Sequence, residues 1–113
     1  MIEQTILNHL SGALDVQCGM ETPAQAPASF VVVEKTGDSR ENLICTAILA
    51  VQSYGETLSQ AAALNSAVKS AMFTAAQLPE IAAVRLNSDY NYTDTSAKRY
   101  RYQAVFDVTY YEI

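Results

Sequence analysis

The chain has 113 residues, which is enough for one domain; half of them are apolar and only 17% are charged. This balance excludes an intrinsically disordered chain, because disorder goes with low hydrophobicity and high charge. Twelve acidic and seven basic residues give a formal net charge of −5. Tight nucleic-acid binding is therefore not expected, since it needs a cationic footprint that releases counterions. We predict one packed domain over residues 1–113.

The sequence carries no recognisable membrane or export signal. No apolar run approaches the roughly 18 residues that a membrane span needs, and the first residues lack a basic segment followed by an apolar stretch. We therefore expect no membrane partner and a location in the cytosol. Cys18 and Cys45 form no CxxC pair and are too few for a disulfide scaffold, so we predict reduced, buried thiols and no zinc.

The first third of the chain alternates helical and extended patterns. Residues 1–14 have apolar positions at spacings of three and four, which predicts a short amphipathic helix. Residues 16–20 fit a brief strand, and Pro23 and Pro27 mark a loop. Extended structure restarts at residues 30–33, because consecutive valines favour a strand. Residues 35–40 contain Gly37 and Asp38 and are predicted to form a hairpin turn.

Residues 41–54 are the longest strand candidate, and both of its faces are rather apolar. One parity runs through Leu43 to Val51, and the other runs through Ile44, Ile48 and Tyr54. A half-exposed strand would alternate more cleanly between apolar and polar residues. This strand is therefore expected either to be central with cover on both sides or to lie against a neighbouring subunit.

The second half of the sequence predicts one long helix and a hairpin. Thr57 and Gln60 fit a capping box, and an apolar stripe with spacings of three and four runs from Ala61 to Leu78 before Pro79 ends the helix. Residues 81–92 and 98–112 are predicted strands joined by a polar turn. In the second strand Tyr100, Tyr102, Ala104, Phe106, Val108 and Tyr110 share one face.

The predicted order is helix, three strands, helix and two strands. We expect an α+β domain with a mostly antiparallel sheet of about five strands packed with two helices.

Candidate catalytic and cofactor patterns are weak. His9 has no nucleophile arranged beside it, and the scattered glycines form no phosphate-binding loop. Asp89, Asn91 and Thr93 resemble the start of a calcium loop, but the sixth position lacks glycine and the twelfth lacks glutamate. We therefore predict no metal, no cofactor and no enzymatic activity.

The run Lys98-Arg99-Tyr100-Arg101-Tyr102 mixes cations with aromatic residues, as single-stranded nucleic-acid platforms do. Strand geometry sends these tyrosines and the arginines to opposite faces. A cationic face that meets acidic residues of a neighbouring subunit is the favoured interpretation. The chain also has seven tyrosines and no tryptophan, and tyrosine suits protein contacts because it offers a large contact area.

Several segments together resemble a family of small tail-terminator or tail-completion proteins of tailed bacteriophages and prophages with long non-contractile tails. The segments are Val33-Glu34-Lys35-Thr36-Gly37, Ser39-Arg40-Glu41-Asn42, Gln52-Ser53-Tyr54-Gly55, and the predicted helix with Ala61-Ala62, Leu64-Asn65 and Val68-Lys69. The resemblance spans most of the chain. Head-tail connector families share a similar size and α+β order.

The resemblance implies a ring, expected to be hexameric, that caps the tail tube and contacts the head-side connector. It also implies assembly in the host cytoplasm, followed by a place in the tail of the virion. We expect subunit or partner contacts at Lys35, Asp38, Arg40, Glu41, Lys98, Arg99, Arg101 and Tyr111. In a closed ring each subunit uses two different patches.

One hypothesis pairs Lys98, Arg99 and Arg101 with Glu34, Asp38 or Glu41 of the next subunit. In another, residues 35–42 project as a docking loop toward the tail tube. A neck connector and a monomeric interaction module remain alternatives at this point.

Overall fold

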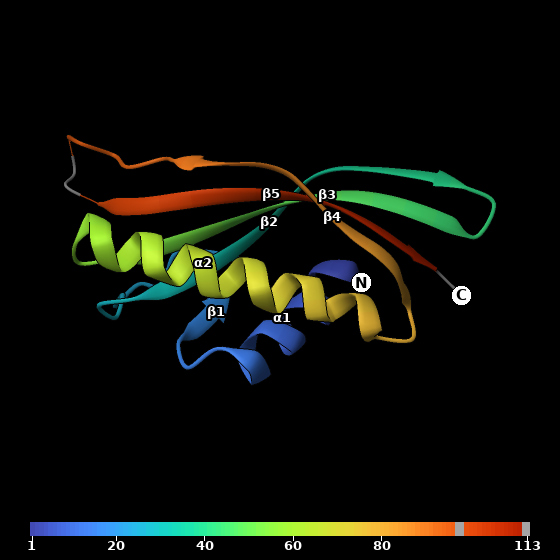
Figure 1. The fold of residues 1–113 in the computed structure, drawn as a ribbon, viewed down its shortest axis with the longest axis horizontal. Helices are drawn as coiled ribbons and strands as arrows, with labels where there is room; N and C mark the ends of the chain where they lie inside the picture. Colours follow the sequence, from blue (N-terminus) through green and yellow to red (C-terminus); the bar gives the residue numbers. More distant parts are fainter. Residues whose placement is uncertain (97–98, 112–113) are drawn as a thin grey trace.

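The computed structural model describes residues 1–96 and 99–111, and over these residues the chain forms two α-helices, a short 3₁₀ helix and a five-stranded sheet (Figure 1). The predicted α+β fold and the predicted order of elements are confirmed. In chain order the elements are α1 (Ile2–Ala13), β1 (Gln17–Gly19), β2 (Phe30–Glu41), β3 (Ile44–Gly55), α2 (Leu58–Thr74), the 3₁₀ helix η1 (Ala75–Gln77), β4 (Ile81–Asn91) and β5 (Tyr100–Tyr111).

The strands lie in the order β1-β2-β3-β5-β4, so β3 is central. Every neighbouring pair is antiparallel except β1 and β2, which are parallel. Both α-helices lie on the same side of the sheet (Figure 1). The long hairpins give the molecule an elongated shape, with extents of 44 × 24 × 24 Å.

The hydrophobic core lies between the two helices and the sheet face that they cover. α1 contributes Ile6 and Leu10, α2 contributes Val68 and Met72, and all four are fully buried. The sheet contributes alternate residues of its inner strands, as the period of two predicts. These are Val31 and Val33 of β2, Cys45, Ala47, Leu49 and Val51 of β3, and Ala104, Phe106, Val108 and Tyr110 of β5.

The predicted turn at residues 35–40 is wrong, because these residues belong to β2 and the chain reverses at Asn42 and Leu43. Asn42 has φ of 58° and is the one described non-glycine residue with positive φ; asparagine tolerates this left-handed conformation better than most residues. Gly37 instead lies in the strand opposite Ile48. The long strand accordingly begins at Ile44, and Glu41 belongs to β2.

The predicted start of α2 is confirmed by its capping contacts. The Thr57 hydroxyl accepts a hydrogen bond from the Gln60 backbone N–H at 3.1 Å. The Gln60 side chain reaches back and accepts from the backbone N–H of Glu56, also at 3.1 Å. Two backbone donors near the helix start therefore have partners.

Polar contacts fix the position of α2 over the outer strand β4. Lys69 and Asn65 of α2 both donate to the Asp89 carboxylate of β4, Asn65 at 2.7 Å. Burial alone would raise the pKa of Asp89, but the hydrogen bonds from Lys69 and Asn65 outweigh it and lower this pKa. Asp89 therefore has two partners on α2, Asn65 and Lys69.

Candidate interaction surface

The helices cover one face of the sheet and leave the other uncovered; we call the uncovered side the open face. Register places alternate residues of β3 on it, beginning with Ile44, Thr46 and Ile48. The sequence left open whether β3 is covered on both sides or meets a neighbour. In the described chain β3 is central and the helices pack on one side of it alone. On its other face Ala50 and Tyr54 are buried, whereas Ile44 and Ile48 stay exposed.

Near the β2–β3 turn, the open face carries three exposed apolar residues, Ile44, Ile48 and Tyr111, with Thr46 between the two isoleucines; we call these three residues the apolar patch. Ile44 lies directly opposite Tyr111 in the register of β3 and β5. Ile44 is 50% exposed, Tyr111 is 47% exposed, and Ile48 is 37% exposed. Leu43, in the adjacent turn, is 59% exposed. Exposed apolar residues that cluster in this way mark contact surfaces more often than single exposed residues do.

The other half of the open face carries a small buried apolar cluster of Phe30, Val32 and Tyr54, beside polar side chains that are linked across three strands. Gln52 of β3 donates to the side-chain oxygen of Gln103 of β5 at 2.8 Å, and Gln103 in turn donates to the Tyr90 hydroxyl of β4. The Tyr54 hydroxyl donates to Gln52 at 3.2 Å. This network gives these side chains hydrogen-bond partners within the sheet.

Arg101 is held by its own chain on this half of the open face. Its guanidinium lies 4.4 Å from the centre of the Tyr92 ring and donates to the Tyr54 hydroxyl at 2.9 Å. The predicted separation of tyrosines and arginines onto opposite faces concerned Tyr100 and Tyr102, which lie in the same strand as Arg101. It missed Tyr54 and Tyr92, because these come from neighbouring segments that share the face of Arg101.

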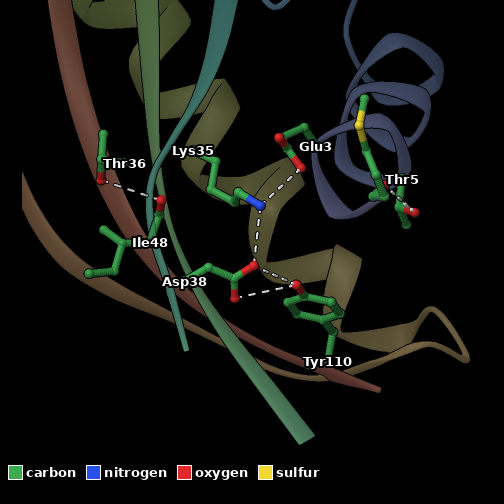
Figure 2. A network of polar contacts seen from close by, with 8 residues as sticks. Glu3, Thr5, Lys35, Thr36, Asp38, Ile48 and Tyr110 are labelled. Atoms are coloured by element: carbon green, nitrogen blue, oxygen red, sulfur yellow. Dashed lines mark hydrogen bonds and ion pairs between the residues drawn. The ribbon is translucent and has the colours of Figure 1, made fainter. Parts of the chain in front are cut away.

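A second polar cluster lies on the helix side, where α1, β2 and β5 meet (Figure 2). The Lys35 ammonium lies 3.2 Å from the Asp38 carboxylate and 3.9 Å from that of Glu3. The Tyr110 hydroxyl donates to Asp38 at 3.1 Å. Burial, together with the hydrogen bond to Asp38, raises the pKa of Tyr110.

This cluster borders a hollow of about 330 Å³ between α1, β2 and the ends of β4 and β5. Glu3, Asp38 and Glu80 line it on the acidic side, and Lys35 contributes one cation. Glu3 is a lining residue that sequence reasoning missed, because only the packing of α1 beside β2 brings it to Lys35.

The predicted interface residues occupy two separate ends of the molecule. Lys35 and Asp38 line the hollow, Arg40 and Glu41 are exposed beside the β2–β3 turn, and Tyr111 belongs to the apolar patch. Arg99 is exposed at the opposite end of β5, next to Arg101. Lys98 lies outside the described residues. Among the described residues, Arg99 and Arg101 lie away from Asp38 and Glu41, acidic residues proposed to meet them in a neighbouring subunit.

His9 has a structural position between the two helices. Its Nε2 lies 2.9 Å from the carbonyl oxygen of Ala71 and 2.9 Å from the Thr74 hydroxyl, both near the end of α2. Within the described residues, no three histidine, cysteine or acidic side chains gather closely enough to hold a metal ion. Neither helix of this part of the chain is long and apolar enough to cross a membrane.

Comparison with known proteins found no family model and no curated sequence that matches this chain.

Proposed function

We propose that the chain is a structural subunit that forms a ring, acting as a tail terminator or tail-completion protein at the head-proximal end of a long phage tail. Two lines support this proposal. The first is the resemblance of residues 33–37, 39–42 and 52–55 and of the α2 residues to that family. The second is the open face of the sheet, which is the observation that carries self-association.

The apolar patch favours burial against a partner. Ile44 and Tyr111 lie opposite each other and are each about half exposed, and Ile48 lies on the same face. Burying a large apolar side chain completely contributes about 1.5–3 kcal/mol, so covering even part of this patch favours association. The backbone of the patch belongs to the sheet, which fixes where its side chains begin.

The placement of the charged residues fits a head-to-tail arrangement. A closed ring joins two different patches of each subunit. Lys35, Asp38, Arg40 and Glu41 lie toward one end of the elongated molecule, and Arg99 lies at the other. The proposed partners are further copies of this chain, the tail-tube protein and a head-side connector protein. The proposed location is the host cytoplasm during assembly and then the virion tail.

Size-exclusion chromatography with light scattering, with and without purified tail tubes, tests this function. We expect an oligomer whose mass is a whole multiple of 12.3 kDa, and association of that oligomer with tail tubes. A monomeric mass at every concentration, both alone and with tubes, would contradict the proposal and favour a monomeric interaction module. An oligomer that binds purified head connectors but ignores tail tubes would favour a neck connector instead.

A further inference from the structure

The sheet has an incompletely paired strand at each side. β1 pairs with β2 only at Phe30, Val31 and Val32. Within residues 1–96 and 99–111 no strand pairs with the remaining outer side of β2, and none pairs with the outer side of β4. Such edges present backbone N–H and C=O groups that can pair with a strand of another chain.

Bulges limit the regular part of both edges. Pairing of β2 with β3 is irregular around Thr36, and pairing of β4 with β5 is irregular around Ala82 and Asn87. Bulges twist an edge and discourage indiscriminate pairing. Two regular stretches remain. One is residues 37–41 of β2, beyond its bulge, and the other is residues 83–86 of β4, between its two bulges.

The two regular stretches lie at the same level of the sheet. Arg85 faces Asp107, Asp107 faces Ile48, and Ile48 faces Gly37, so Arg85 and Gly37 occupy one row across the strands. The chain of antiparallel pairings also makes β4 antiparallel to β2. A neighbouring copy placed beside β4 in the same orientation would therefore present its β2 for antiparallel pairing, which is slightly more stable than parallel pairing.

Unpaired charges of opposite sign mark these two edges on the open face. Arg85 is exposed on β4, and Glu34 and Glu41 are exposed on β2. None of these three side chains has a hydrogen bond or ion pair with any residue that the structure describes. Asp107 lies opposite Arg85, yet its carboxylate accepts from Asn87. In the sheet register Arg85 lies between the levels of Glu34 and Glu41.

We propose that β4 of one copy pairs antiparallel with β2 of the next, with Arg85 on the same face of the joined sheet as Glu34 and Glu41 of that neighbour and at a level between them. The proposal rests on the proposed function, because its partner is a second copy of this chain. The two edges differ, so the contact is heterologous and repeats from copy to copy until it closes. Opposite charges across paired strands stabilise the pairing, and like charges weaken it.

A charge swap at the two edges tests the pairing. Light scattering over a range of protein concentrations measures the concentration at which half of the protein is assembled. Arg85→Glu should raise this concentration about tenfold, because one attraction becomes a repulsion at every junction. Adding Glu34→Arg or Glu41→Arg should restore assembly toward the wild-type concentration.

Two controls keep the result specific. Arg85→Glu combined with Glu21→Arg has the same net charge as the rescued variants, but Glu21 lies in the exposed loop before β2. This control should assemble as poorly as Arg85→Glu alone. If it assembles as well as the rescued variants, net charge explains the rescue and the proposal is overturned. Circular dichroism should show the same folded state for all variants, because every substituted side chain is exposed.

Hydrogen exchange gives a second measurement that needs no substitution. Amides in residues 37–41 and 83–86 that face outward should exchange at least about tenfold more slowly in the assembled protein than in the dilute monomer. One outcome would overturn edge pairing alone: wild-type protein assembles, these amides stay unprotected, and Arg85→Glu assembles normally. In that case the proposal of a ring still holds. If wild-type protein never assembles, the proposed function fails as well.

Discussion

Tyr110 and Arg101 show how single residues near the predicted interface also have partners within their own chain. The Tyr110 hydroxyl donates to Asp38, and its ring is 7% exposed. Arg101 bonds to Tyr54 and lies over the ring of Tyr92. Replacing Arg101 therefore removes contacts inside the subunit. Arg99 is exposed, so reversing the charge of Arg99 instead of Arg101 reports on contacts between subunits.

The raised pKa of Tyr110 predicts a specific loss of stability at alkaline pH. An unfolded tyrosine ionises near pH 10, whereas folded Tyr110 keeps its proton to higher pH because it is buried and bonded to Asp38. Its contribution is complete below about pH 10 and is lost as pH rises further. Between pH 9 and 11 the wild-type free energy of unfolding should therefore fall about 1 kcal/mol more than that of Tyr110→Phe.

Urea unfolding at each pH measures this difference. Tyr111→Phe is the matched control, because Tyr111 is the exposed neighbour of Tyr110 on the other face of β5. It should keep the wild-type dependence on pH. Identical pH dependence of wild type and Tyr110→Phe would mean that the contact with Asp38 does not hold the phenol protonated.

At the scale of elements, the junction between β3 and α2 depends on the small size of Gly55. A Cβ atom at Gly55 would lie 2.7 Å from the Ala61 backbone nitrogen and 3.0 Å from the Gln60 carbonyl carbon. Gly55→Ala should therefore destabilise the fold by about 1–3 kcal/mol, because the first turn of α2 must move away from the strand. Urea unfolding midpoints at neutral pH measure this effect.

Gly12 provides the matched control for this substitution. It lies near the end of α1, and a Cβ there meets nothing within 4 Å. Gly12→Ala should be neutral or stabilise by up to about 1 kcal/mol, since alanine favours a helix more than glycine. Equal effects of the two substitutions would contradict the close approach of β3 and α2.

Local sequence signals predicted the elements well where a repeating pattern or a cap defines them. The apolar stripe of α1, the capping box of Thr57 and the alternation from Ala104 to Tyr110 all match the structure. The turn was misplaced because Gly37 and Asp38 look like turn residues, while the strand pairing depends on register with Ile48 and Ala47. Asn42, which carries the reversal, sits in a polar run that offered several equivalent positions.

The candidate surface was predicted less completely, because it depends on which strands become neighbours. The double apolar parity of residues 41–54 indicated an unusual face at Ile44 and Ile48. Nothing in the local pattern showed that Tyr111 would lie beside Ile44 or that Glu3 would approach Lys35. The same holds for Arg85, whose level relative to β2 follows from three successive strand pairings.

At the scale of the whole molecule, a layer of helices on one face alone makes the sheet asymmetric. The helix side carries the core, so substitutions there change folding and assembly together. The apolar patch lies on the other side, and its exposed side chains can be changed with little effect on folding, since exposed substitutions usually stay within about 0.5 kcal/mol. This separation allows assembly to be tested apart from stability.

The double variant Ile44→Ser/Ile48→Ser should therefore weaken self-association and leave the fold intact. Both side chains lie on the open face, at 50% and 37% exposure, and lose the apolar area that a second copy would cover. We expect the concentration for half-assembly, measured by light scattering, to rise at least about tenfold. Leu58→Ser is the matched control, because Leu58 is 40% exposed at the start of α2, away from this face. Assembly that survives the double variant, or that Leu58→Ser disrupts equally, would contradict a subunit contact at the apolar patch.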